Sequence, residues 1–178
     1  MAMKSSPTRY GAVPIAIHWL TAIAILAMLV SGLSADSATD AVVQLTLLRF
    51  HVVTGLLVGI LTLLRIIWFL AVDRRPADAA GLSRGQALAA HIVHYALYAV
   101  VLVMVASGIG TMALSGAGAQ LVGAAPLPLP DFSLVPPFTI HGLLARGLML
   151  LLVGHIGAAL WHQFVRRDRL LARMGLGS

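Results

Sequence analysis

The sequence predicts an all-α membrane protein, a four-transmembrane-helix bundle that forms one domain over residues 1–178. Of the 178 residues, 60% are hydrophobic and only 10% are charged, whereas a soluble domain carries about 25% charged residues. Four apolar segments are each long enough to cross the hydrocarbon core of a bilayer, which takes about 20 helical residues. Lipid is therefore the solvent that we expect for most of the chain.

Pro14 is compatible with the start of the first predicted helix, because a first turn leaves its N–H groups unpaired. The first segment loosely resembles a signal peptide. Its apolar run is long, however, and Ser34–Ala35–Asp36 is not a convincing cleavage context. We therefore expect this segment to be retained as a helix. The four helices are predicted at residues 14–33, 43–72, 87–114 and 138–165.

Three connections join the helices at residues 32–40, 73–85 and 115–137. The third is the longest and is rich in glycine and proline, so we expect no regular helix in it. A loop of this length is often functional, although it can equally be a surface cap. We find no internal sequence repeat. The prolines of the third connection are Pro126, Pro128, Pro130, Pro136 and Pro137.

The distribution of charge predicts the orientation in the membrane. The net charge of +6 does not indicate nucleic-acid binding, because the basic residues cluster at the edges of the apolar segments. The first and third connections carry Asp36, Asp40 and Asp131, and they carry no lysine or arginine. By the positive-inside rule, both chain termini are cytoplasmic. The two termini and the middle connection carry Lys4, Arg9, Arg74, Arg75, Arg84, Arg166, Arg167, Arg169 and Arg173.

Several kinds of metal centre are excluded because the chain has no cysteine. Disulfides, iron–sulfur clusters, thiolate-ligated haem and covalent haem attachment through C-x-x-C-H all require cysteine. Any metal must therefore be held by nitrogen, oxygen or methionine sulfur.

Most of the seven histidines fall inside apolar runs, where ionisable side chains are costly and are therefore candidates for function. His141 and His155 lie fourteen residues apart on one predicted helix. That spacing returns to nearly the same helix face and separates the two imidazoles by about 21 Å along the axis. One helix can thus supply a ligand to each of two haems, one above the other.

Depth, counted along each helix from the flanking charges, assigns the histidines to two leaflets. The outer leaflet holds only His51 and His141, so they must be the axial pair of any outer haem. His155 is the natural inner ligand on the last helix, but its partner is either His18 or His94, and geometry alone does not choose. The inner histidines are His18, His91, His94, His155 and His162.

Helix packing and metal transport are the alternatives to haem ligation for these histidines. A lone intramembrane histidine often only hydrogen-bonds to a neighbouring helix, but two cross-helix pairs matched in depth are harder to explain in that way. Imidazoles are favoured haem ligands whose second ring nitrogen needs only an acceptor. Zinc or copper transport would favour acidic co-ligands, and no Asp or Glu occurs within any predicted span.

Weaker features are compatible with haem binding. Gly55 and Gly108 would let a macrocycle approach the backbone, or they serve ordinary helix packing. Arg65 and Arg146 can pair with haem propionates, although Arg65 can instead extend its charge to the cytoplasmic interface. The interfacial anchors that we expect are Trp19, Trp68 and Trp161.

In this combination the chain resembles the bacterial cytochrome b561 family of small four-helix, di-haem membrane proteins. Each motif is weak alone, but the ordered set is specific and spans nearly the whole chain. The motifs are Ile17–His18–Trp19, Arg49–Phe50–His51 with Gly55, His91-x-x-His94 followed by Leu97–Tyr98, and His141, His155 and His162 at spacings of fourteen and seven.

The resemblance implies two haem b groups and a quinone site. It pairs His18 with His155 at the inner haem, and His51 with His141 at the outer haem, the latter in agreement with the depth argument. It makes His94 and His162 quinone-site residues, since histidines that titrate near neutrality can relay protons. A packing role is the alternative for His94. His91 is expected at the interface.

The implied activity is that of a membrane oxidoreductase in the bacterial inner membrane. Electrons would enter at the outer haem, pass to the inner haem and reduce ubiquinone on the cytoplasmic side. Family members of this free-standing size are similar to superoxide oxidases, which oxidise periplasmic superoxide to oxygen. Arg49, beside His51, is the candidate for guiding that anion, although outer loops with three aspartates give poor long-range steering.

Two other functions are compatible with intramembrane histidines. One is a haem electron-carrier subunit that links a separate dehydrogenase or hydrogenase to the quinone pool. The other is a metal or proton transporter with histidine relays. The absence of acidic residues from the predicted spans and the absence of an inverted repeat disfavour it. The expected partners are membrane lipid, a quinone, and superoxide or another periplasmic electron donor, with no nucleic acid and a monomeric state.

Overall fold

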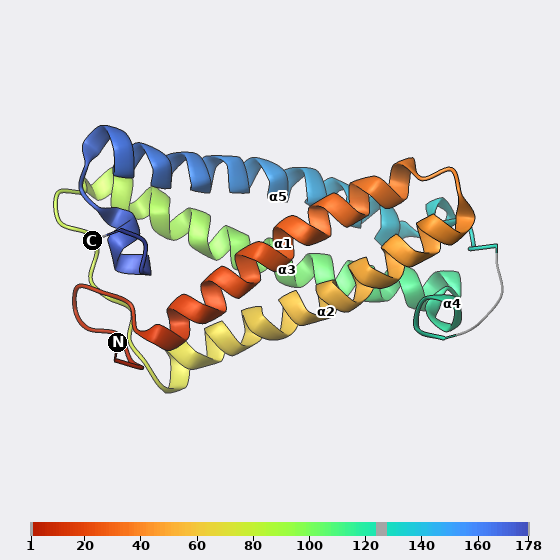
Figure 1. Ribbon diagram of the computed structural model, residues 1–178, viewed down its shortest axis with the longest axis horizontal. Coiled ribbons are helices and arrows are strands. Elements are labelled where there is room, and N and C mark those ends of the chain that lie inside the picture. The colour runs from red at the N-terminus through yellow and green to blue at the C-terminus, as the bar shows by residue number, and fades with distance from the viewer. Residues whose placement is uncertain (1, 124–127, 178) are drawn as a thin grey trace.

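The computed structural model describes residues 2–123 and 128–177, and throughout these residues the regular structure is helical. Four long helices run the length of the molecule (Figure 1), and each is long and apolar enough to cross a membrane. The predicted fold class, an all-α membrane bundle of four helices, is confirmed. The long helices are α1 (Ala12–Ser37), α2 (Ala41–Ala71), α3 (Arg84–Ser115) and α5 (Pro136–Trp161).

The long helices extend a few residues beyond most of the predicted ends. At the starts of α2 and α3 the reason is a polar capping residue that lies outside the apolar stretch. The carboxylate of Asp40 caps α2 by accepting from the N–H groups of Val42 and Val43. Ser83 and Gln86 form a capping box at the start of α3. Hydropathy marks the lipid-facing part of a helix, whereas these polar caps determine where it begins.

The outer connection contains more regular structure than predicted. A short helix, α4 (Gly118–Val122), precedes its prolines, and a 3-10 turn, η1 (Phe132–Leu134), follows Asp131. The expectation of no regular helix in this connection is therefore wrong for its first part, which contains no proline to prevent one. Pro126 lies outside the described residues.

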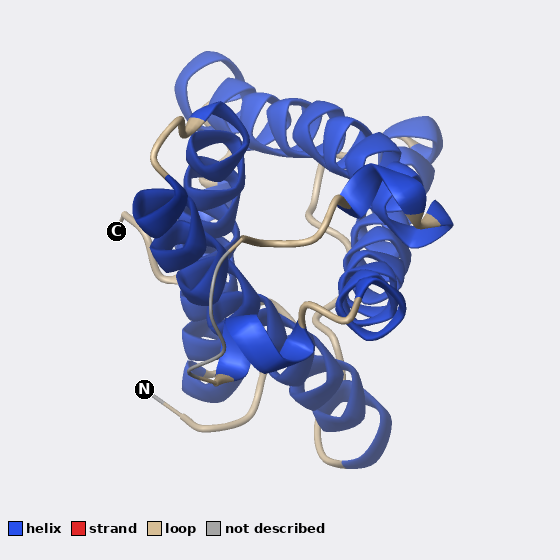
Figure 2. Cartoon of the chain, turned by 90° about the vertical axis from the view of Figure 1, so that its right-hand side faces the viewer, coloured by secondary structure: helices blue, strands red, loops and turns tan. Residues whose placement is uncertain are grey.

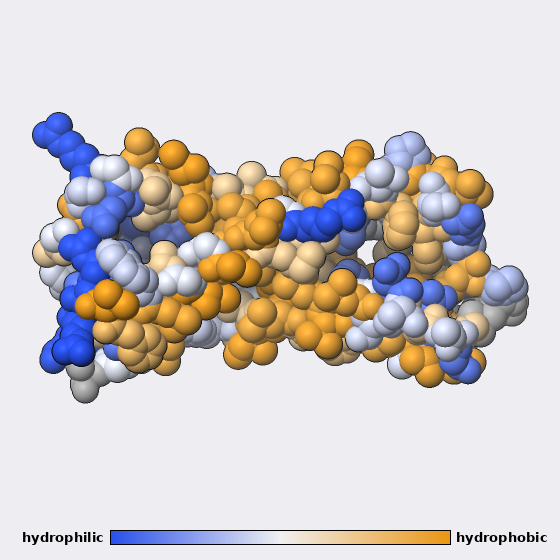
Figure 3. Space-filling view, turned by 90° about the horizontal axis from the view of Figure 1, so that it is seen from above, coloured by the Kyte–Doolittle hydropathy of each residue, from blue (hydrophilic) through white to orange (hydrophobic). Residues whose placement is uncertain are grey.

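The helices pack as two hairpins, α1 along α2 and α3 along α5, and α2 also contacts α3. Viewed end-on in Figure 2, the four long helices stand around the bundle axis, and loops cross only at the ends. On the face shown in Figure 3, the surface between the two ends is largely apolar. Leu150 and Val153, for example, are 75% and 72% exposed. An apolar outer surface is what lipid requires.

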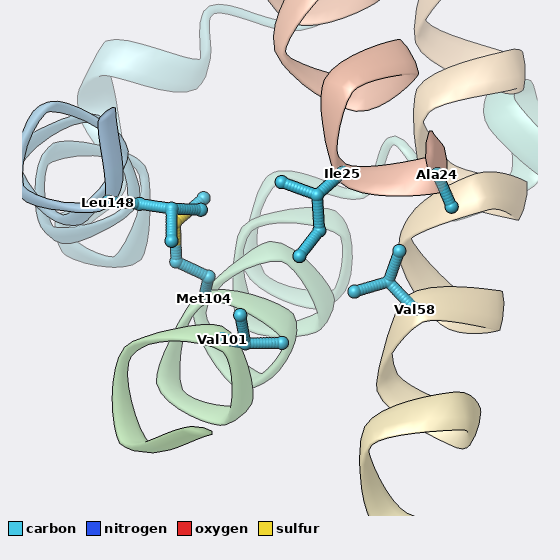
Figure 4. Packing of buried hydrophobic residues seen from close by; sticks show 6 residues of the cluster. All are labelled: Ala24, Ile25, Val58, Val101, Met104 and Leu148. Atoms are coloured by element: carbon cyan, nitrogen blue, oxygen red, sulfur yellow. The ribbon is translucent and has the colours of Figure 1, made fainter. Parts of the chain in front are cut away.

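A small apolar layer fills the middle of the bundle, where side chains from all four long helices point toward one another (Figure 4). Four of them lie seven residues from a histidine on the same helix: Ile25 follows His18, Val58 follows His51, Val101 follows His94, and Leu148 stands midway between His141 and His155. Seven residues are about two helical turns, or about 10 Å. The layer therefore separates an inner from an outer level of histidines.

Both termini lie at one end of the bundle (Figure 1), where backbone and side-chain hydrogen bonds join them. The Tyr10 N–H donates to the carbonyl of Arg173, and Trp19 Nε1 donates to the carbonyl of Met174 in the 3-10 turn η3 (Leu170–Met174). Trp68 Nε1 donates to the Asp73 carboxylate. The indoles of Trp19 and Trp68 thus hydrogen-bond at this end of the bundle.

The carboxylate of Asp73 joins the N-terminal segment to the end of α2. It accepts from the N–H and hydroxyl of Ser5, from Trp68 and from the N–H of Arg74. Burial alone would raise the pKa of Asp73, but these hydrogen bonds outweigh burial and hold the pKa below its usual value. Asp73 is therefore a structural anion.

Candidate haem sites

The outer site pairs His51 of α2 with His141 of α5 across the bundle. Their ring centroids are 6.1 Å apart, and the ring planes differ by 69°. Two imidazoles that bind one iron from opposite sides, with bonds of about 2 Å, have centroids about 6 Å apart. The pair is therefore spaced as two axial ligands would be.

The second ring nitrogen of each outer histidine has a backbone partner. His51 Nδ1 lies 3.0 Å from the carbonyl oxygen of Met28, and His141 Nδ1 lies 3.0 Å from that of Met104. A carbonyl only accepts, so each Nδ1 carries the proton and donates. Each Nε2 then keeps its lone pair, which is the state that metal binding requires.

A serine one turn further along supports each of these contacts. Ser31 Oγ lies 3.3 Å from His51 Nδ1, and Ser107 Oγ lies 3.0 Å from His141 Nδ1. Both serines belong to a Met-x-x-Ser-Gly segment, at residues 28–32 of α1 and 104–108 of α3. The expectation of no internal repeat therefore missed this short one, which contains no histidine to mark it. The repetition itself was the available signal.

The glycine that ends each segment lies against the imidazole that the segment holds. A Cβ on Gly32 would lie 3.1 Å from His51 Cε1, and a Cβ on Gly108 would lie 3.5 Å from His141 Cε1. At Gly55 a Cβ would instead meet Met28, at 3.2 Å. Gly108 therefore belongs to the outer site, whereas Gly55 serves the packing of α1 on α2.

The inner site brings three histidines together. The rings of His18 and His155 have centroids 6.4 Å apart, and those of His94 and His155 are 5.4 Å apart. The separation of His18 from His155 matches that of two axial ligands, whereas the separation of His94 from His155 is shorter than that. Both residues that depth counting offered as partners for His155 thus lie beside it, and the spacing favours His18.

Arg65 lies beside the inner histidines with its charge uncompensated by a carboxylate among the described residues. Its Nη1 donates to His18 Nδ1 at 2.7 Å, so His18 carries its proton on Nε2, unlike the outer histidines. The Nε–H of Arg65 is buried without a partner. A buried, unsatisfied guanidinium N–H is costly, and a carboxylate is its usual partner. A haem propionate fits this requirement. If it drew Arg65 away from His18, Nδ1 of His18 would be free to act as a hydrogen-bond donor.

The remaining basic candidates are placed differently. Arg146 is exposed and has no ion pair in the described part of the chain. Arg49 donates through Nη2 to the carbonyl of Gln120, at 2.8 Å, and to that of Gly123. These carbonyls lie in and just after α4, so Arg49 holds the outer connection against α2.

The two predicted quinone-site histidines lie in different surroundings. His94 is on α3 against His155. His162 begins a π-helical turn, η2 (His162–Arg166), that extends α5; it is buried and hydrogen-bonds to Asp168. Among the described residues, no hydrogen bond or ring contact joins His94 to His162. His91 is exposed and pairs with Asp78 at 2.9 Å, at the polar end of α3.

Comparison with known proteins places this arrangement in a family. The family model described as prokaryotic cytochrome b561 matches residues 9–177. The chain is 29% identical to "Cytochrome b561 homolog 2" of Escherichia coli K12, over 98% of this chain and 95% of the relative. It is 33% identical to "Cytochrome b562" of Cereibacter sphaeroides, over 93% of this chain and 94% of the relative. No solved structure matches the chain.

A four-helix membrane bundle fits this family, and the chain has four helices of membrane-spanning length in its described residues. The resemblance noted from the sequence motifs is confirmed over nearly the whole chain. The chain belongs to the prokaryotic cytochrome b561 family and is a multi-pass membrane electron-transfer protein of the b-haem type.

Proposed function

We propose that this protein is a di-haem b-type cytochrome of the bacterial inner membrane that transfers electrons from the outer face to ubiquinone. The observation that carries the proposal is the presence of two histidine pairs at axial-ligand spacing, 6.1 Å and 6.4 Å, on two levels of one bundle. The apolar layer around Leu148 separates the two levels. When bound, haem b supplies one-electron redox chemistry at each level.

The chain's own residues orient the ligands. His51 and His141 would hold the outer haem, with Nδ1 of each fixed by a methionine carbonyl. His18 and His155 would hold the inner haem, and Arg65 would pair with one of its carboxylates. The charge pattern assigns the inner level to the cytoplasmic side, which puts both termini in the cytoplasm.

Ubiquinone is the acceptor that the inner level suits best. His94 lies directly against His155 of α5, and His162 follows the end of α5 that we assign to the cytoplasmic side. A quinone takes up two protons with two electrons, and histidines are the side chains that exchange protons near neutral pH. We therefore assign His94 and His162 to the quinone site.

Superoxide is the electron donor that we propose at the outer level, with Arg49 as the nearest cation to attract it. One observation favours a second candidate, an electron-carrier subunit for a separate dehydrogenase or hydrogenase. The N–H groups of Arg49 are bound to the carbonyls of Gln120 in α4 and of Gly123 just after it, and the outer connections hold no lysine or arginine of their own. A protein donor would not depend on steering by that cation.

Two measurements test the proposal. Haem content per chain should be two, with b-type bands in the reduced-minus-oxidised spectrum. His51→Ala or His141→Ala should remove one haem, and His18→Ala or His155→Ala the other. A content of one haem, or a pairing that differs, would refute the di-haem assignment.

The donor is tested by exposing the oxidised protein to superoxide with and without ubiquinone. Fast haem reduction that is followed by quinone reduction supports superoxide as donor. Arg49→Gln should slow the first step without altering re-oxidation by quinone. Slow haem reduction that is insensitive to Arg49→Gln would favour the carrier function instead.

A further inference from the structure

The chain after α5 folds back sharply to bring a carboxylate to His162. The helix first widens into the π-helical turn η2, and Arg167 and Arg169 then adopt left-handed backbone angles, with φ of 55° and 57°. They are the non-glycine residues with positive φ among those described. Left-handed angles are unfavourable for residues with a Cβ, and glycine is the usual residue at such helix ends. Two arginines are thus held in this conformation on either side of Asp168.

The carboxylate between them is bound to the histidine. Asp168 Oδ2 lies 2.5 Å from His162 Nδ1, and the two side chains are only 22% and 11% exposed. The Asp168 N–H also donates to the carbonyl of His162. Arg166 Nε lies 3.8 Å from the same carboxylate oxygen. Backbone and side-chain contacts therefore both orient this carboxylate toward the imidazole.

We propose that Asp168 is the positioning residue that makes His162 the proton donor to quinone, an inference that rests on the proposed quinone reduction. A carboxylate can only accept from Nδ1–H, so it keeps the proton of that nitrogen in place. Nε2 is then the nitrogen that exchanges protons. The carboxylate also stabilises the imidazolium that forms when Nε2 is protonated.

Reduction of one quinone to quinol consumes two electrons, supplied from the outer donor, and two protons from the cytoplasmic side. His162 gives one proton from Nε2 to a quinone oxygen and regains it at the same nitrogen from water. The second proton reaches the other quinone oxygen from water on the cytoplasmic side. Asp168 remains a carboxylate throughout.

The experiment uses the full-length, haem-loaded protein with its haems pre-reduced, and follows their re-oxidation by ubiquinone through the b-type absorbance bands. This readout is independent of the outer donor. Asp168→Asn should lower the limiting rate by about ten-fold or more, as expected for impaired general acid catalysis. The quinone concentration at half-maximal rate and the haem spectrum should change little. Asp168→Glu, which retains the carboxylate, should restore most of the rate.

The chain offers a matched control in its other histidine–aspartate pair. Asp78→Asn breaks the exposed contact with His91 at the same end of the bundle and should leave re-oxidation unchanged. His162→Gln should slow re-oxidation at least as much as Asp168→Asn. The double variant should be no slower than His162→Gln alone, because the two residues act as one unit.

The different failures are distinguishable. Normal re-oxidation in Asp168→Asn with slow re-oxidation in His162→Gln would overturn the positioning role and leave the quinone proposal intact. Normal re-oxidation in both variants and in His94→Gln would overturn the assignment of the quinone site. If Asp168→Asn does not assemble with haem, Asp168→Glu decides: a limiting rate as low as that of His162→Gln would overturn the inference, and a near-normal rate supports it.

Discussion

Gly32→Ala and Gly108→Ala form a matched pair of substitutions that tests how the outer histidines are held. Both glycines end a Met-x-x-Ser-Gly segment, and both lie against an imidazole. The space differs, however. An added Cβ would lie 3.1 Å from His51 Cε1 and 3.2 Å from its Nδ1, but 3.5 Å and 3.7 Å from the same atoms of His141. The contact at Gly32 is tight enough that the His51 ring must shift, whereas the contact at Gly108 is an ordinary van der Waals contact.

The magnitudes follow from these distances. Alanine in place of a helical glycine favours the helix by about 0.8–1 kcal/mol, so Gly108→Ala should be neutral or slightly stabilising. Gly32→Ala must displace the His51 ring by a few tenths of an ångström, and this displacement weakens the hydrogen bond from Nδ1 to Met28. Losing such a bond costs about 1 kcal/mol, which corresponds to roughly five-fold to ten-fold weaker retention of the outer haem.

The assay is haem content per chain after extended dialysis, together with the reduced-minus-oxidised spectrum. Gly32→Ala should lose about one haem under conditions in which the wild-type protein and Gly108→Ala retain both. Equal loss from the two variants would refute the reasoning from Cβ contacts. Full retention in Gly32→Ala would show that the ring has room to move.

Three further outcomes are expected. Arg65→Gln should weaken retention of the inner haem about ten-fold or more, since a charge-assisted hydrogen bond contributes about 1.5–3 kcal/mol; unchanged haem content would argue against pairing with a propionate. Asp40→Ala should lower the free energy of unfolding by about 1 kcal/mol, because α2 loses its cap. Thermal unfolding measures this effect, and Asp36→Ala, which removes no helix cap, is the control. The pKa of Asp73 is lower in the folded protein than in the unfolded chain. Its carboxylate therefore stabilises the fold fully at a pH above the unfolded pKa of about 3.9. This stabilisation is lost as the pH falls through the folded pKa. Asp73→Asn should therefore lower the Tm at pH 7 and cease to matter in strong acid, and a difference that persists there would contradict this assignment.

The part of the site that could be predicted from sequence is the part that depends on depth. Counting depth along the sequence leaves only His51 and His141 in the predicted outer leaflet, and the structure brings their rings together. Depth could not choose between His18 and His94, and both contact the ring of His155. Residues at the same depth are distinguished only by the rotation of their helices.

The contacts that orient the histidines could not be predicted in the same way. The methionine carbonyls on α1 and α3 are backbone groups that every residue possesses, so no residue type marks them. Each imidazole reaches its carbonyl, and the serine beside it, only because the packing brings a neighbouring helix close. Nothing in the sequence pattern singles out Asp168, because it lies beyond the last span and only two left-handed residues return it to His162.

Apolar length and histidine spacing predict the number of spans and the two levels of histidines, and the charges predict the orientation. In lipid every backbone polar group must be satisfied within a helix, so apolar length alone predicts the spans. Only the packed structure shows which ring nitrogen of each histidine is available for iron and which charged side chains lack a partner. These helices are apolar on nearly all sides, so hydropathy does not reveal which face turns inward. Only packing sets the helix rotations that bring Met28 to His51 and Arg65 to His18.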